Sequence, residues 1–311
     1  MSRPEEETPE ATQKATPEAT TEGLPKARPK ARTIVITGAS DGIGKSAAFT
    51  LHAAHQYDDS PTELVLVGRN PEKTRSVAQQ INAKYYTADF SDLSEVRALA
   101  QTLKDNHPHI DVLANNAGGY FDGPLITKDG YELTWQVNYA APFLLTTLLL
   151  DKLISANATV VNTSSVAAQY LSRFSFKDTQ SLSRFSSRRA YGNSKLAQVM
   201  FTHELHRRFH SQGLNAVAFH PGVIATNFAS GTRGLLALGY HSAARKVMSD
   251  VAKGGENLAY FIDGTPDIAW KSGLFYNDRR TPGKIRKIAY DDSSTEKLYD
   301  MTERYLQLRE H

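Results

Sequence analysis

The chain has 311 residues, of which 40% are hydrophobic and 22% are charged, so it can bury the core of one large α/β domain. Its formal net charge of +3 is small, which argues against nucleic acid as a partner and favours small molecules. Because the chain contains no cysteine, disulfides, thiolate metal sites and a cysteine nucleophile are excluded. No apolar run is long enough for a signal peptide or a transmembrane segment, and we expect a cytoplasmic protein.

The first 31 residues differ in composition from the rest of the chain. They are rich in Pro, Glu, Thr and Ala, and they carry Thr-Pro-Glu-Ala-Thr twice, at 8–12 and 16–20. A segment without hydrophobic periodicity cannot bury a core, so we predict a disordered tail over residues 1–31. No linker rich in Pro, Gly or Ser follows, which predicts one folded domain over residues 32–311.

Short apolar or β-branched runs then alternate with helical segments. The runs lie at 33–37, 63–67, 85–88, 112–114, 159–162, 216–219 and 273–276. This alternation predicts an α/β fold with a doubly wound, parallel, seven-stranded sheet, and the hydrophobicity of the runs predicts helices on both faces. A closing helix is expected from Ser293 to about Leu306, because Ser293 and Glu296 form a Ser-x-x-Glu capping pattern.

A glycine-rich turn follows the first predicted strand. It reads Thr-Gly-Ala-Ser-Asp-Gly-Ile-Gly over 37–44 and runs directly into a helical segment at 45–55. Such glycines let the backbone approach a pyrophosphate, and the helix N-terminus favours negative charge. The alternative is that they only build a tight turn. The context favours a Rossmann-type cofactor loop, whose expected binding residues are Gly38, Ser40, Gly42, Ile43 and Gly44.

Further motifs follow this loop in a fixed order. They are Asn115-Asn116-Ala117-Gly118 after the fourth strand, Asn138 in a helix expected over 133–150, Ser165 ending the fifth strand, Tyr191 and Lys195 opening the next helix, and Pro221-Gly222 closing the sixth strand. This series resembles the short-chain dehydrogenase/reductase family over about residues 32–280. The gap between Ser165 and Tyr191, and Gly-Arg-Asn at 68–70, are most similar to the retinol dehydrogenase and WW-domain oxidoreductase group.

The end of the second predicted strand bears on the choice of cofactor. An acidic residue there would bind the adenosine ribose and repel a 2′-phosphate, but the chain has Gly68. Arg69 follows with a guanidinium suited to a phosphate, so NADP(H) is preferred and NAD(H) is the alternative. Asp41 opposes this preference, because many NADP-linked relatives carry a basic residue in the glycine loop. Arg69 could also be an ordinary exposed arginine.

The resemblance implies further cofactor contacts. The matching positions are Asp89, Asn115, Ala117, Gly118, Pro221, Gly222, Val223 and Thr226. Among them, Asp89 would bind the adenine amino group and Asn115 would steady the adenosine side of the pocket. Val223 and Thr226 would contact the nicotinamide carboxamide. Turn or strand-end hydrogen bonding is the alternative for Asn115 and Thr226.

Tyr191 and Lys195 stand four residues apart, so both side chains project from one face of a helix. At about 4 Å and an effective dielectric near 20, phenolate and ammonium attract by roughly 4 kcal/mol. This attraction would lower the pKa of the tyrosine toward neutral pH. Tyr191 could then give a proton to a carbonyl oxygen or take one from an alcohol. The resemblance implies that Lys195 also reaches the nicotinamide ribose.

Two more side chains complete the expected catalytic group. Ser165 lies where ligands bind in open α/β sheets, and its hydroxyl could hydrogen-bond the substrate oxygen. Ser164 is the competing residue, and the family pattern Ser-Ser-x-Ala favours the second serine. The resemblance implies that Asn138 holds a water molecule that links Lys195 to solvent.

Three other signals carry less weight. His203, His206 and His210 share one helix, but no carboxylate cluster accompanies them, so we expect no metal site. Residues 169–189, between the two catalytic motifs, are interpreted as an insertion at the rim of the site. Residues 229–247 occupy the place of the family's substrate lid, and their apolar side chains suggest a lipophilic substrate, although helix packing would look the same.

These observations predict an NADP(H)-dependent oxidoreductase that reduces a lipophilic ketone or aldehyde, or oxidises the corresponding alcohol. Asn138, Ser165, Tyr191 and Lys195 would carry the chemistry. The alternatives are a cofactor-binding regulatory protein without turnover and an NAD-linked alcohol dehydrogenase. Relatives often pair through the helices that begin here near Thr134 and Arg189, so a homodimer or homotetramer is a further hypothesis.

Overall fold

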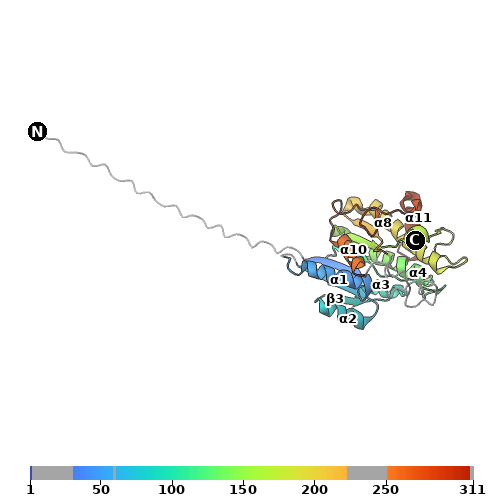
Figure 1. Ribbon diagram of the computed structural model, residues 1–311, viewed down its shortest axis with the longest axis horizontal. Coiled ribbons are helices and arrows are strands. Elements are labelled where there is room, and N and C mark those ends of the chain that lie inside the picture. The colour runs from blue at the N-terminus through green and yellow to red at the C-terminus, as the bar shows by residue number, and fades with distance from the viewer. Residues whose placement is uncertain (2–30, 59–60, 223–250, 309–311) are drawn as a thin grey trace.

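The computed structural model describes residues 1, 31–58, 61–222 and 251–308 (Figure 1). The predicted tail over 1–31, the lid segment at 229–247, Val223 and Thr226 therefore lie wholly or almost wholly outside the described residues. None of the described helices is both long enough and apolar enough to cross a membrane.

The predicted seven-stranded parallel sheet is confirmed. Its strand order is β3-β2-β1-β4-β5-β6-β7, with all neighbours parallel. The strands are β1 (Arg32–Thr37), β2 (Thr62–Gly68), β3 (Lys84–Thr87), β4 (Val112–Asn115), β5 (Thr159–Thr163), β6 (Asn215–Phe219) and β7 (Phe275–Tyr276). The order reverses between β1 and β4, and ligands bind at such a point beyond the carboxyl ends of the strands.

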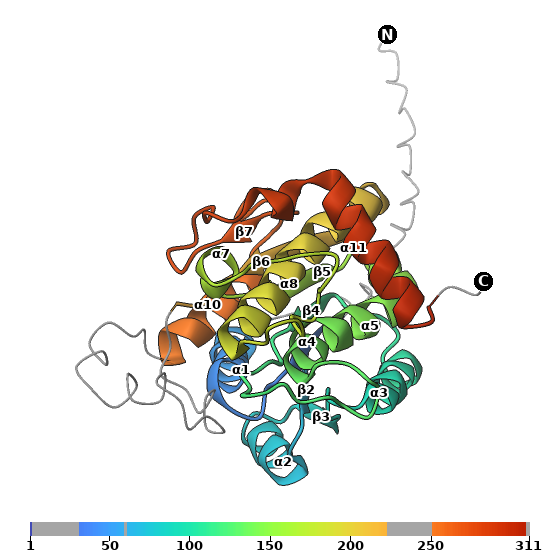
Figure 2. The same ribbon diagram turned by 90° about the vertical axis from the view of Figure 1, so that its right-hand side faces the viewer.

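Helices cover both faces of the sheet (Figure 2). One layer consists of α1 (Gly42–His55), α2 (Pro71–Gln80) and α10 (Val251–Asp263), and the other of α3 (Leu93–Asn106), α5 (Ala141–Leu148) and α8 (Ser187–Phe209). Successive strand side chains point to opposite faces, so Ile34 and Ile36 join the first core and Val35 the second. Shorter helices are α4 (Leu133–Trp135), α6 (Leu150–Ser155), α7 (Ala167–Tyr170), η2 (His210–Gln212) and η5 (Lys287–Tyr290).

The single helix predicted over 133–150 is wrong in detail. After α4, the segment η1 (Gln136–Ala140) is a π-helix, and α5 and α6 follow separately. Asn138 lies in the middle of the π turn. Such wide turns occur mostly as single insertions in helices and often at functional sites.

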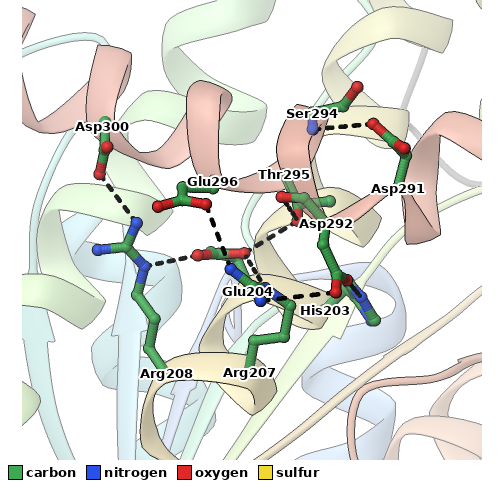
Figure 3. A network of polar contacts seen from close by, with 10 residues as sticks. All are labelled: His203, Glu204, Arg207, Arg208, Asp291, Asp292, Ser294, Thr295, Glu296 and Asp300. Carbon is green, nitrogen blue, oxygen red and sulfur yellow. Dashed lines mark hydrogen bonds and ion pairs between the residues drawn. The ribbon is translucent and has the colours of Figure 1, made fainter.

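The closing helix α11 (Asp292–Tyr305) begins earlier than predicted. The carboxylate of Asp291 accepts a hydrogen bond from the Ser294 amide at 2.9 Å and forms the N-cap, so Ser293 is not the cap. Asp291 is the cap because it precedes Ser293 by two residues and its side chain reaches a free N–H group of the first helical turn. Ion pairs join α11 to the outer side of α8 (Figure 3).

Helix α11 also covers the surface that the pairing hypothesis requires. The ring of Tyr299 is 2% exposed and lies 4.9 Å from Phe143 of α5 and 6.1 Å from Phe201 of α8, centroid to centroid. The hydroxyls of Tyr139 and Thr302 are 2.9 Å apart. The outer faces of α5 and α8 are therefore buried within one copy of the chain.

Candidate active site

The glycine loop joins β1 to α1 at the switch point of the sheet. Gly38 and Gly42 adopt positive φ angles of +67° and +54°, which glycine tolerates without a steric penalty. A Cβ on Gly44 would lie 2.4 Å from the carbonyl oxygen of Gly38, so only glycine fits there. The loop therefore forms a cradle without side chains at the start of α1, which fits the pyrophosphate of a dinucleotide.

The turn after β4 is locked to this cradle through Thr37. Its hydroxyl accepts hydrogen bonds from the amides of Asn116 at 2.9 Å and Ala117 at 3.0 Å. The Asn116 side chain donates to the Thr37 carbonyl at 3.0 Å. Asn116 was not among the predicted site residues, although its amide side chain in the Asn-Asn-Ala-Gly motif was a signal that could have identified it.

Asn115 lies in the core. Its side chain is 0% exposed and donates to Thr146 at 2.9 Å and to Asn162 at 3.0 Å. Any effect on the adenosine side of the pocket must therefore pass through the position of the β4 strand end. The predicted role of Asn115 stays a prediction.

Polar residues at the ends of β2 and β3 surround the expected adenosine position. A Cβ on Gly68 would lie 2.9 Å from the Ser40 Cβ, so the glycine lets the loop approach the strand. Arg69 beside it is exposed and forms no ion pair within the described chain. Asp41 forms a 3.8 Å ion pair with Lys73. Beyond β3, the carboxylate of Asp89 is partly exposed and accepts hydrogen bonds from residue 91.

Lys195 is a buried cation next to Tyr191. Its side chain points inward from α8, and the residue is 3% exposed. The ammonium donates to the Thr163 carbonyl at 2.9 Å and to the Gln198 side-chain oxygen at 3.2 Å, and lies 5.9 Å from the Tyr191 ring centroid. Burial lowers the pKa of Lys195 to about 7. The expected pairing of Tyr191 and Lys195 on one helix face is thus present in the geometry.

Asn138 and Lys195 converge on Gly118. A Cβ on Gly118 would lie 2.7 Å from the Asn138 side-chain oxygen and 3.2 Å from the Lys195 Nζ. The Asn138 amide accepts from the Gly119 N–H at 2.8 Å and donates to the Gly119 carbonyl at 2.9 Å. The π turn therefore brings Asn138 onto the loop after β4, next to the lysine.

The two serines after β5 have different surroundings. Ser164 is 2% exposed, and its hydroxyl donates to the Lys195 carbonyl at 2.7 Å. Ser165 is partly exposed, and its hydroxyl oxygen accepts from the Ala167 amide at 3.1 Å. Since accepting this bond leaves the hydroxyl proton available for donation, the geometry favours Ser165 over Ser164.

Tyr120 lies beside Tyr191 in the candidate site, although no sequence motif predicted it. Its ring centroid lies 5.6 Å from that of Tyr191, and burial raises the pKa of its phenol. It follows the Asn-Asn-Ala-Gly motif by two residues, so the end of β4 was the available signal. Beyond the end of β6, Pro221 is buried and Gly222 has a φ of +103°.

Within the insertion at 169–189, Arg189 holds the segment together by contacts inside the insertion itself. Its guanidinium donates to the carbonyls of Ser181 at 3.2 Å and Arg184 at 2.7 Å.

Two of the three histidines on α8 and just after it lie close together, because the ring centroids of His206 and His210 are 4.5 Å apart. Within the described ranges, no group of three or more His, Cys, Asp or Glu side chains could hold a metal ion.

A phosphate cradle, a tyrosine-lysine pair and a serine at the carboxyl edge of a parallel sheet define a dinucleotide-dependent oxidoreductase. The family model for short chain dehydrogenases matches residues 32–234, and the chain belongs to this family. The predicted resemblance is confirmed. The protein is an NAD(P)-dependent oxidoreductase that acts on carbonyl or alcohol groups.

Named relatives and solved structures are similar to this chain. A Streptomyces sp. (strain C5) protein named "Putative daunorubicin C-13 ketoreductase DnrU" is 36% identical, covering 80% of this chain and 84% of its own. Retinol dehydrogenase 14 of Mus musculus is 29% identical, covering 88% and 85%. A crystal structure from Mycobacterium paratuberculosis has a TM-score of 0.67 at 29% identity, covering 89% and 93%. An NADPH-bound carbonyl reductase from chicken fatty liver, with a TM-score of 0.61 at 21% identity and coverage of 81% and 98%, shares the fold.

Proposed function

We propose that the protein is an NADP(H)-preferring enzyme that interconverts a lipophilic ketone or aldehyde and its alcohol, with Asn138, Ser165, Tyr191 and Lys195 as its catalytic group. The observation that carries this proposal is the position of Lys195. An ammonium is held in the core without a carboxylate partner among the described residues, beside the Tyr191 ring and the Gly118 backbone. Buried charges without a counter-ion are costly, and active sites are where such groups are retained.

The proposed chemistry follows from what each side chain can donate. In the reduction, the Tyr191 hydroxyl gives its proton to the substrate oxygen, and the Ser165 hydroxyl donates a hydrogen bond to the same oxygen. The Lys195 ammonium lowers the free energy of the tyrosinate that remains. Asn138, fixed to Gly119, lies next to Lys195 on the proposed route by which a proton returns from solvent. The nicotinamide, when bound, supplies the hydride.

Two cations support a preference for NADP(H). Arg69 is exposed beside Gly68 and has no carboxylate partner in the described part of the chain, so its guanidinium is available for a 2′-phosphate. Lys73 lies in the first turn of α2 and is 3.8 Å from Asp41. The ion pair partly neutralises the aspartate, which was the residue that opposed this preference.

Two observations support a lipophilic substrate. The Tyr120 ring lies beside Tyr191 and presents an aromatic surface where the reacting carbon would lie. The names of two relatives refer to retinol and to a C-13 ketone of daunorubicin, which supports an organic alcohol or ketone as substrate here.

The test is oxidation of NADPH and NADH by the purified protein against a panel of lipophilic ketones and aldehydes. Tyr191→Phe removes the proton donor and is expected to abolish turnover, whereas Tyr57→Phe, at a tyrosine that is 87% exposed, serves as the matched control. Turnover that persists in Tyr191→Phe would refute the catalytic assignment. Cofactor binding without turnover of any compound on the panel would favour a regulatory protein. Faster turnover with NADH than with NADPH would favour an NAD-linked alcohol dehydrogenase.

A further inference from the structure

Gln198 lies one helical turn after Lys195 and contacts its ammonium. The residue is 1% exposed, and its side-chain oxygen accepts the 3.2 Å hydrogen bond from Lys195 Nζ. The spacing of three residues places both side chains on the same face of α8. Gln198 therefore belongs to the immediate surroundings of the lysine, although no sequence motif identified it.

Among the residues that the structure describes, Lys195 is held by neutral acceptors only. Its two hydrogen-bond acceptors are the Thr163 carbonyl and the Gln198 side-chain oxygen. Burial is the one cause that lowers its pKa, and no charged side chain in the described ranges contributes. Within the described ranges, the titratable group that faces it is the phenol of Tyr191, on its own helix. The charge of Lys195 thus depends on two oxygen dipoles, of which only the Gln198 oxygen belongs to a side chain.

A chain of buried hydrogen bonds holds the helix turn that carries Gln198. The Thr202 hydroxyl donates to the Gln198 backbone carbonyl at 2.8 Å and accepts from the Asn162 side chain at 2.9 Å. Asn162 in turn accepts from Asn115 at 3.0 Å. These partners are all 0% exposed, so the network fixes α8 against β5 and β4 from inside the core.

The orientation of the Gln198 amide is set by the lysine. An ammonium can only donate, so the amide must present its oxygen to Lys195. Its nitrogen is left buried without a partner among the described residues. An unpaired buried N–H is destabilising, and a leucine of similar size would avoid it. The amide is therefore explained better by its contact with Lys195 than by packing.

We propose that Gln198 is a positioning residue, which holds the Lys195 ammonium as its side-chain acceptor and so sets the pH range in which Lys195 supports proton transfer by Tyr191. The proposal rests on the proposed function, because it requires Tyr191 and Lys195 to be the acid/base pair. Asn115 acts in the same network, since it anchors Asn162 and, through it, the turn of Gln198.

The first experiment compares pH profiles of kcat/KM for ketone reduction in wild type, Gln198→Leu and Gln198→Glu. Reduction requires the charged lysine, so activity falls as pH rises. Gln198→Leu removes the acceptor, and the alkaline limb is expected to move to lower pH by about half a unit or more. Gln198→Glu adds an opposite charge and should move the limb to higher pH.

The matched control is Asn257→Leu on α10. Its amide is 2% exposed and pairs with the Asp278 carbonyl at 3.1 Å and with Arg280 at 3.0 Å. This variant loses a buried amide of the same kind without touching Lys195. The alkaline limb of its pH profile of kcat/KM should coincide with that of the wild type. If both Gln198 variants lower the rate without moving the limb, the amide only packs and the proposal is wrong.

A second measurement needs neither substrate nor cofactor. Thermal unfolding at pH 6, where Lys195 is charged, is compared for Gln198→Leu in the wild-type and Lys195→Met backgrounds. Gln198→Leu should lower Tm in the wild-type background, because Lys195 loses a hydrogen-bond acceptor. It should not lower Tm in the Lys195→Met background, because no cation is present there. Equal changes in both backgrounds would overturn the proposal. Since this cycle reports without turnover, it separates failure of the Gln198 proposal from failure of the proposed function.

Discussion

Two buried charges on α8 have opposite surroundings. Glu204, near the end of the helix, has a side chain that is 0% exposed and meets two guanidinium groups (Figure 3). Arg207 lies at 3.0 Å and Arg208 at 2.6 Å, and the Thr295 hydroxyl of α11 donates to it at 2.9 Å. Lys195, nine residues earlier, is also buried, but its hydrogen-bond partners among the described residues are only carbonyl oxygens.

The difference in surroundings suggests that the two charges have different roles: Glu204 holds two helices together, and Lys195 is proposed to take part in the reaction. A buried carboxylate with two cations and a hydroxyl is compensated, and it joins α8 to α11. A buried ammonium without a counter-ion lowers stability, so its retention implies a use other than stability. We expect substitutions of Glu204 to change folding and substitutions of Lys195 to change turnover.

Lys195→Met gives the largest expected effect. Removing the cation beside Tyr191 should lower kcat/KM by roughly 10³-fold, because the tyrosinate loses its stabilising charge. Lys253→Met, on α10 after the lid segment, serves as the control and should leave the rate unchanged. Near-normal rates in Lys195→Met would contradict the proposed role of Lys195 in the reaction and, with it, the difference between the roles of Lys195 and Glu204.

Glu204→Ala tests the compensated charge. Two arginines would lose their buried partner, so the free energy of unfolding should fall by about 3–5 kcal/mol. Glu296→Ala is a matched control, because this carboxylate is 54% exposed and lies 3.5 Å from Arg207. That exposed pair should contribute less than about 1 kcal/mol. Denaturant unfolding measures both, and equal losses would contradict the compensated role.

The stability of Lys195→Met should also depend on pH with a defined sign. The folded pKa of Lys195 is about 7, against an ordinary value of 10.5, so unfolding takes up a proton between these values. Wild-type stability therefore rises with pH in this window, and the stability of the variant relative to wild type should fall by up to about 1.4 kcal/mol per pH unit. Below pH 7 the difference should be constant. Unfolding curves without this slope would show that the ammonium is not buried as described.

Arg69→Ala extends the comparison to an exposed cation that has no ion-pair partner in the described part of the chain. If its guanidinium binds the 2′-phosphate, KM for NADPH should rise roughly 10–100-fold while KM for NADH hardly changes. Arg75→Ala is the matched control, because Arg75 is also an exposed arginine and lies nearby, on α2. Equal losses with both cofactors would contradict a phosphate contact.

The covered face of α8 leads to a smaller, structural prediction. Because α11 buries the outer sides of α5 and α8, we expect the chain to sediment as a single copy at micromolar concentration. The ring of Tyr299 would have to leave this contact for a second copy to pair there. A dimer found by sedimentation would have to use another surface.

The parts that were predictable depend on local pattern. The glycine turn, the alternation of strands and helices, and the order of the later motifs predicted the sheet and the pairing of Tyr191 with Lys195, because spacing along a helix or strand sets which side chains share a face. Even so, Asp291 caps α11 two residues before the expected Ser293. Helix ends depend on which side chain reaches the free N–H groups first.

The parts that were missed depend on contacts between distant segments. The π turn at Asn138 comes with two hydrogen bonds to Gly119, and nothing in the local sequence marks it. The positions of Tyr120 and Gln198 beside Tyr191 and Lys195 depend on the packing of α8 against the ends of β4 and β5, which no local motif predicts. The burial of Asn115 in the core was also not predicted, since a motif does not say which way each side chain points, and its cofactor role stays a prediction.

Gly118 shows that the proposed catalytic centre depends on the absence of a side chain at one position. The two nearest atoms to a Cβ there would be the Asn138 oxygen and the Lys195 nitrogen. The Asn138 side chain is held by three hydrogen bonds, two to Gly119 and one to Ser194, which resist any shift. A single methyl group at this position would therefore push on two proposed catalytic side chains at once. In a mutational scan, a residue without a side chain would behave like the residues that perform the reaction.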